Sequence, residues 1–193
     1  MYAIHTTEGF VIGSAPYGEA GKIVSLLTRD FGLVSAVAQG IRLERSKLRY
    51  HVQDLSFGSF SLVRGKEFWR LTSASPSAAP ARPPHPAGRA LLARVAALLR
   101  RLLHGEGADP GLFECVDACA RTLAAGGIGA DGRLETLESV TVSRILRALG
   151  YIAAGPDAGA EPAGLGPADL DRLSAKRAEM NREINRALKA SHL

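Results

Sequence analysis

The stretch from Leu55 to Ala74 reads LSFGSFSLVRGKEFWRLTSA, and it predicts two β-strands joined by a tight turn. Within the first strand, Phe57 opposes Phe60 across the pleat. Gly58 between them allows the bend or bulge that the corner of a β-barrel requires. This stretch therefore indicates a small barrel rather than a flat sheet.

The residues before this stretch extend the same pattern toward the N-terminus. Turn signals separate short segments of β character, which gives five candidate strands: residues 10–12, 23–28, 33–38, 55–63 and 68–71. Five strands within about 70 residues predict a Greek-key barrel of the OB type, an architecture whose open face and loops bind oligonucleotides.

The third predicted strand leads into a basic stretch, SAVAQGIRLERSKLR at Ser35–Arg49. Its first half alternates like a strand, and its second half is a predicted loop with cations at Arg42, Arg45, Lys47 and Arg49. Such side chains are rarely buried without partners, so they lie in water or against anions. Phosphate is the anion we favour, and a solvated charged loop is the alternative.

The N-terminal segment as a whole also carries a net positive charge. Residues 1–73 contain nine Lys or Arg and six Asp or Glu. The predicted nucleic-acid-binding residues are the loop cations together with those at turns and strand ends: Lys22, Arg29, Arg42, Arg45, Lys47, Arg49, Arg64 and Lys66.

Binding of single strands also needs aromatic faces for the bases. The candidates are Tyr17, Tyr50, Phe68 and Trp69, although Trp69 fits the core equally well. Phe10, Phe57 and Phe60 are expected in the core.

The composition is that of a basic globular protein. The chain has 193 residues, of which 46% are apolar and 22% charged, with a net charge of +5 and a pI of about 9.6. It contains no apolar run long enough to span a bilayer and no signal-peptide pattern, so we expect no membrane partner and a cytoplasmic location. Cys115 and Cys119 are expected to be small core residues rather than zinc ligands or a disulfide.

The second half of the chain is predicted to be helical. Residues 74–87 contain five prolines and are predicted to be a stiff linker between a domain at residues 1–73 and a helical domain at residues 88–193. Apolar residues at helical spacing predict helices from residue 88 to 104, from 110 to 125 and from 134 to 149, the last capped by Gly150. A final helix is predicted from residue 167 to about 190, with a solvated basic face favoured over an anion-binding one. The fold class is thus α+β, a five-stranded OB barrel followed by an all-α bundle.

Several motifs of the N-terminal segment, read together, resemble the RecO family of bacterial DNA recombination mediators. They are YGEAGKIVSLLTRDFG at Tyr17–Gly32, VAQGIRLERSKLR at Val37–Arg49, and the opening stretch at Leu55–Ala74. Gln39 stands where the family usually has Lys, so one cation is missing there. The segment SRILRALGY at Ser143–Tyr151 also resembles the helical half of these proteins.

This resemblance implies a non-enzymatic protein of DNA repair and recombination. Such a protein would bind single- and double-stranded DNA, promote annealing, and help to load the RecA recombinase onto strands coated by single-strand-binding protein. RecR and the acidic C-terminal tail of single-strand-binding protein would be its partners, and the nucleoid its place of action. Residues 153–166 lack the four cysteines of the family's zinc module, so no cofactor is expected.

Two other functions remain open from the residues alone. One is an adaptor whose basic surface binds an acidic protein tail, with Arg94, Arg100 and Arg101 as possible contributors of charge. The other is an OB module that binds RNA. The sequence has no Walker loop, dinucleotide glycine fingerprint or Ser-His-Asp ordering, which disfavours an enzyme.

Overall fold

The computed structural model describes residues 3–76, 85–126, 128, 132–153 and 165–191. The chain divides into two compact units, one formed by residues 1–82 and 96–110 and the other by residues 83–95 and 111–193. Most of the proline-rich segment, residues 77–84, lies outside the described residues. The linker and the domain bounds drawn from it therefore stay predictions.

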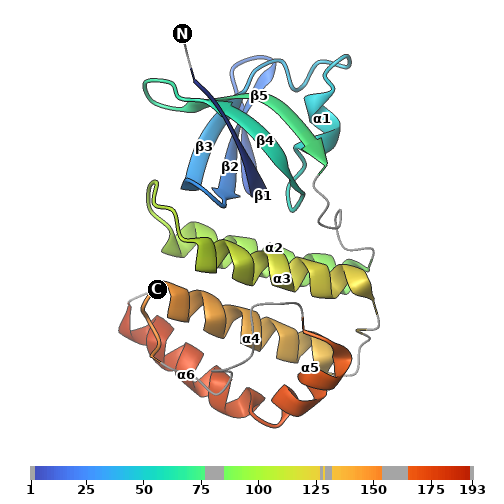
Figure 1. Cartoon of the computed structure of the whole chain (residues 1–193), viewed down its shortest axis with the longest axis vertical. Helices are drawn as coiled ribbons and strands as arrows, with labels where there is room; N and C mark the ends of the chain where they lie inside the picture. The colour runs from blue at the N-terminus through green and yellow to red at the C-terminus, as the bar shows by residue number, and fades with distance from the viewer. Residues whose placement is uncertain (1–2, 77–84, 127, 129–131, 154–164, 192–193) are drawn as a thin grey trace. The chain divides into compact units, whose positions relative to one another are not determined.

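The first unit contains the predicted five-stranded OB barrel (Figure 1). The strands close in the order β1-β2-β3-β5-β4, and only the β3–β5 pairing is parallel. Their bounds are β1 (Ile4–Tyr17), β2 (Gly21–Thr28), β3 (Gly32–Ala38), β4 (Phe57–Val63) and β5 (Trp69–Pro76).

Strand β1 is much longer than the segment at residues 10–12 that was predicted. Its first half pairs with β4 from Ile4 to Phe10, and its second half pairs with β2 from Gly9 to Tyr17. The register shifts between Val11 and Gly13, where the strand passes from one partner to the other. Sequence periodicity underestimates β1 because its polar ends are held by pairing with neighbours rather than by burial.

The structure confirms that the three phenylalanines predicted for the core are buried. Phe10, Phe57 and Phe60 are buried, and the Phe10 and Phe57 rings stack with centroids 4.4 Å apart. Trp69 is also buried, at 4% exposure, so it belongs to the core and is not a free surface for a base.

A segment far along the sequence completes this unit. Helix α2 (Pro86–Leu102) has its residues from 96 onward in the first unit. Arg100 on this helix donates a hydrogen bond to the backbone carbonyl of Ile12 at 2.7 Å. The loop that follows α2 forms an isolated β-bridge between Glu106 and Gly32.

The second unit is helical, as predicted, and contains the first part of α2 with α3 (Pro110–Ala125), α4 (Arg133–Ala148), α5 (Pro167–Ser174) and α6 (Arg177–Ala190). Gly150 ends α4 with φ at +78°, and the amide of Tyr151 donates to the carbonyl of Leu146. Among the described residues, no helix is both long enough and apolar enough to cross a bilayer.

The single final helix predicted from residue 167 was wrong, because α5 and α6 are separate. The amide of Lys176 donates to the carbonyl of Leu173, three residues back, and Ser174 Oγ caps the carbonyl of Asp171. These short-range bonds form a turn between the two helices. The apolar spacing continues across the turn, since Leu173 and Met180 are both buried, and so the pattern alone does not show the break.

We expect Gly32→Ala to destabilise the first unit much more than Gly18→Ala. Both glycines have positive φ, which costs any residue with a Cβ about 1–2 kcal/mol. A Cβ on Gly18 meets no atom within 4 Å, whereas one on Gly32 overlaps the backbone carbonyl of Gly107. Urea unfolding followed by the fluorescence of Trp69, the only Trp in the sequence, measures the difference. Equal midpoints for the two variants would contradict the close approach of the loop to β3.

Candidate nucleic-acid interface

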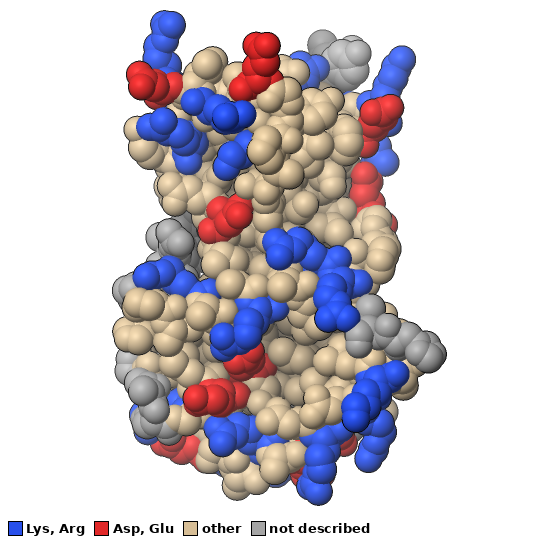
Figure 2. Space-filling view, turned by 180° about the vertical axis from the view of Figure 1, so that it is seen from behind, with Lys and Arg blue, Asp and Glu red and all other residues tan. Residues whose placement is uncertain are grey.

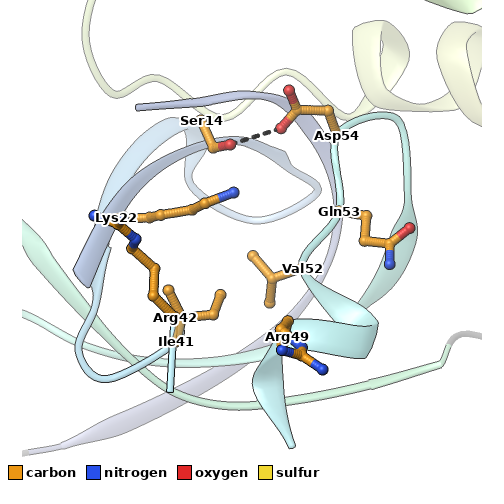
Figure 3. Close-up of a pocket in the computed structure, with 8 residues that line it drawn as sticks. All are labelled: Ser14, Lys22, Ile41, Arg42, Arg49, Val52, Gln53 and Asp54. Atoms are coloured by element: carbon orange, nitrogen blue, oxygen red, sulfur yellow. Dashed lines mark hydrogen bonds between the residues drawn. The ribbon is translucent and has the colours of Figure 1, made fainter. Parts of the chain in front are cut away.

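A pocket of about 400 Å³ opens at one end of the barrel, within the first unit (Figure 3). Ile41 and Val52 form its apolar floor, and each is only 2% exposed. The polar lining comes from β1, β2, the loop after β3, the short helix α1 (Leu48–His51) and the residues that follow it: Ser14, Lys22, Arg42, Arg49, Gln53 and Asp54. We call this site the barrel-mouth pocket.

The register of the sheet explains why Lys22 enters this pocket. Lys22 lies two residues before Val24 and four before Leu26, whose side chains are in the barrel core. Side chains at alternate positions of a strand share a face, so Lys22 points to the inner side at the end of β2. Figure 3 shows its ammonium group directed into the pocket.

The barrel-mouth pocket brings together three of the eight predicted cations. Lys22 is half-buried, whereas Arg42 and Arg49 are exposed. Within the described residues, neither Lys22 nor Arg42 forms an ion pair, and the Arg49 guanidinium lies 5.3 Å from the centre of the Tyr50 ring. Cations that share a pocket and form no ion pair attract anions from solution.

Three other predicted cations are exposed near turns of the barrel. Arg45 and Lys47 follow Arg42 in the same loop, and Lys66 lies in the turn between β4 and β5. Figure 2 shows Lys and Arg side chains close together on the barrel, with acidic side chains beside them.

The remaining two predicted cations are held by acids within the first unit. Arg29 pairs with Glu8 at 3.0 Å. Arg64 pairs with Glu106 at 3.1 Å, and its guanidinium lies 5.2 Å from the centre of the Trp69 ring. Both therefore contribute less to the attraction of an anion than their charge in the sequence indicates.

The aromatic residues predicted to stack on bases differ in their exposure. Tyr17 and Tyr50 are exposed, at 46% and 65%. Tyr17 meets Phe68 edge to face, with ring centroids 6.1 Å apart. Trp69 instead packs against Phe31 and donates its indole N–H to Glu106 at 2.8 Å.

Sequence reasoning did not single out Ser14, Asp54 or Glu106. Ser14 Oγ donates to Asp54 Oδ1 at 2.8 Å, across 40 positions of sequence. Glu106 accepts from Trp69 with one carboxylate oxygen and pairs with Arg64 through the other. No local pattern connects residues that far apart, and only the barrel topology brings them together.

Two of the three arginines considered for an acidic tail make other interactions. Arg94 forms a two-bond ion pair with Glu138, at 2.6 Å for each bond, and this hydrogen bonding raises the pKa of Arg94. Arg100, which belongs to the first unit, is bonded to Ile12. No group of three or more His, Cys, Asp or Glu side chains suited to a metal ion occurs in the described part of the chain.

We expect Glu106→Ala to destabilise the first unit by about 1–3 kcal/mol, because it leaves the buried indole N–H of Trp69 without its acceptor. The measurement is urea unfolding followed by Trp69 emission. Glu67→Ala removes the same charge from an exposed site with no interaction in the described structure, and it serves as the control. An equal effect of the two substitutions would show that the Glu106–Trp69 bond contributes nothing specific.

We expect the thiol of Cys119 to react with a disulfide reagent at pH 8 only when the second unit unfolds. Burial raises the pKa of this thiol to about 12, and the thiolate is the reactive form. The half-buried Cys115 should be modified first. A Cys115→Ser variant isolates the slow thiol, and its rapid modification in native buffer would contradict the burial of Cys119.

Comparison with known protein families gives a match that covers the barrel. The family described as "Recombination protein O N terminal" matches residues 1–79. The DNA repair protein RecO of Heliobacterium modesticaldum is 37% identical over 73 residues, which is 38% of this chain and 27% of that protein. The RecO proteins of Rubrobacter xylanophilus and Dehalococcoides mccartyi are 39% identical over 72 residues and 38% identical over 66 residues, respectively. These two matches cover 37% and 34% of this chain, and 29% and 26% of the relatives.

The chain thus matches little more than a quarter of the length of these curated relatives. The residues that the family model matches lie in the N-terminal part that forms the barrel. The OB domain at residues 1–79 of this chain is therefore similar to the N-terminal domain of RecO proteins.

Proposed function

We propose that this chain acts in DNA repair and recombination by binding single-stranded DNA at the barrel-mouth pocket and the adjacent basic loop. The observation that carries the proposal is the convergence of Lys22, Arg42 and Arg49 on one pocket of an OB barrel. Arg45 and Lys47 extend this cationic surface along the loop. A basic groove with nearby aromatic faces is the usual way in which OB folds hold single strands.

The proposed activity is annealing of complementary strands without nucleotide hydrolysis. Cations that bind phosphates lower the repulsion between two strands, so that complementary bases can meet in one place. The exposed rings of Tyr17 and Tyr50 offer stacking surfaces that leave the hydrogen-bonding edges of bases free. Neither effect needs a catalytic residue, which agrees with a mediator rather than an enzyme.

The further roles follow from the similarity of the N-terminal domain to RecO proteins and are likewise proposals. They are assistance in loading RecA onto strands coated by single-strand-binding protein, binding of double-stranded DNA, and partnership with RecR. An action on DNA would place the protein at the bacterial nucleoid.

A second candidate function, the binding of an acidic protein tail, is favoured by a groove in the second unit. This groove of about 300 Å³ is lined by Tyr151, Ile152 and Arg186, among other residues. An apolar wall beside a guanidinium suits a tail that ends in an aromatic residue and a carboxylate. Glu183 also lines the groove and would oppose such a tail. The tail of single-strand-binding protein is the proposed occupant.

We expect the affinity for single-stranded DNA to fall steeply with salt. If the five cations of the pocket and loop each neutralise one phosphate, the slope of log affinity against log salt is about −3.5, at about −0.7 per phosphate. Replacing Lys22, Arg42 and Arg49 together by Ser should reduce the slope to about −1.4 and abolish annealing. Fluorescence anisotropy with a labelled oligonucleotide measures the slope, and mixing of two labelled complementary strands measures annealing.

The matched control is the triple change of Arg182, Arg186 and Lys189 to Ser on α6, which removes the same charge from the second unit. This control should leave the DNA slope unchanged and weaken the binding of an acidic peptide. If the salt slope changes in the control variant but not in the pocket variant, the DNA site lies on the helices and not at the barrel. Tighter binding of RNA than of DNA of the same sequence would favour the RNA-binding alternative.

A further inference from the structure

The barrel-mouth pocket contains a carboxylate that a site made only for phosphates does not need. Asp54 lies in the lining with Lys22, Arg42 and Arg49, yet it forms no ion pair with any of them in the described structure. Its one hydrogen bond there is the bond that Oδ1 accepts from Ser14 at 2.8 Å. Ser14 thus fixes the orientation of an acid whose charge would repel a phosphate.

The polar groups of the pocket are divided between two sides. In Figure 3, Ser14 and Asp54 lie together on one side, Arg42 and Arg49 lie across from them, and the ammonium group of Lys22 lies between. A phosphate is attracted to the arginine side and repelled from the Asp54 side. A group with N–H donors, in contrast, is favoured at the Asp54 side.

The size and the floor of the pocket fit a single nucleotide. Its volume of about 400 Å³ is at the lower end of the range for small-molecule sites, which begins at about 300 Å³. The buried side chains of Ile41 and Val52 offer an apolar surface for the face of a base. A nucleotide with its phosphate toward the arginines would direct its base over this floor toward Asp54.

The carboxylate of Asp54 discriminates among the bases by their donors. The Watson–Crick edge of guanine has two adjacent donors, N1–H and the N2 amino group, which match two carboxylate oxygens. Cytosine and adenine each offer one amino group beside an acceptor nitrogen, and thymine offers one N–H between two carbonyls. Because each carboxylate oxygen has two lone pairs, the bond from Ser14 leaves Oδ1 able to accept a second hydrogen bond.

We propose that the barrel-mouth pocket holds one nucleotide of the bound strand and that Asp54, oriented by Ser14, makes this subsite prefer guanine. The inference rests on the proposed function, since it adds base selectivity to a DNA site whose affinity comes from the cations. It predicts that selectivity and affinity depend on different residues.

The test uses the full chain and labelled 15-nucleotide thymidine oligomers that carry one central substitution. A single guanine should raise the affinity about fivefold over the all-thymine oligomer, at the low end of discrimination by a paired side chain. Hypoxanthine, which keeps N1–H and lacks the N2 amino group, should give an intermediate value. A single guanine per strand avoids the association of guanine-rich strands with one another.

Asp54→Asn should remove the preference for guanine and raise the affinity for the all-thymine oligomer, because the side chain no longer repels phosphate. Glu44→Gln removes one negative charge from the exposed basic loop, outside the pocket, and should keep the preference. Native Trp69 emission verifies that each variant is folded. Ser14→Ala should weaken the preference, because it frees the Asp54 carboxylate to rotate.

The inference is overturned if the unsubstituted protein binds all the oligomers equally, or if Asp54→Asn keeps the guanine preference. Either result would leave the proposed function standing, since the oligomers would still bind. Absence of binding to every oligomer at low salt would instead overturn the proposed function itself.

Discussion

The structure of the first unit depends on the division of β1 between two partners. The first half of β1 pairs with β4 and the second half pairs with β2, and the register shift after Val11 allows the strand to turn between them. Without this strand the sheet would have two open edges instead of a closed barrel. The same strand carries Ser14 to the pocket and pairs it with Val24, two residues from Lys22. The strand that closes the barrel therefore also positions part of the site.

Among the described residues of the closed barrel, some cations form ion pairs with acids and others do not. Arg29 lies beside β1, where Glu8 neutralises it, and Arg64 is held by Glu106 from the segment after α2. The loop between β3 and β4 has only Glu44 and Asp54 near its cations, and neither acid forms an ion pair in the described structure. Positive charge is thus balanced at Arg29 and Arg64 and left unbalanced at the loop between β3 and β4.

The sequence was sufficient to predict features that rest on local patterns. The five strands, the buried phenylalanines and the basic loop follow from alternation, turn residues and charge, and the structure contains them. The eight proposed contact residues differ only in their surroundings, which are not local. Glu106 reaches Arg64 and Trp69 across 42 and 37 positions, respectively, so no window of sequence shows that Arg64 is neutralised.

The break between α5 and α6 has a similar explanation. A helix is predicted from the spacing of its apolar residues, and that spacing continues through the turn at Lys176. The turn is made by hydrogen bonds of the backbone and of Ser174, which contribute nothing to the apolar pattern. Amphipathic periodicity therefore identifies the buried face correctly while missing the interruption.

The barrel-mouth pocket illustrates a general distinction between affinity and selectivity at charged sites. Attraction between cations and phosphates is independent of sequence, because every nucleotide carries the same phosphate. An acid inside such a site weakens that attraction, and Asp54 is moreover held in place by Ser14 rather than by a cation. If Asp54 were paired with Lys22 or Arg42, the cation would neutralise its charge and occupy its oxygens. Because Asp54 is held by a hydroxyl instead, its carboxylate keeps its charge and can still accept hydrogen bonds from a ligand. The loss of affinity is then offset only if the ligand presents donors to that carboxylate, and in a nucleic acid the donors are on the bases.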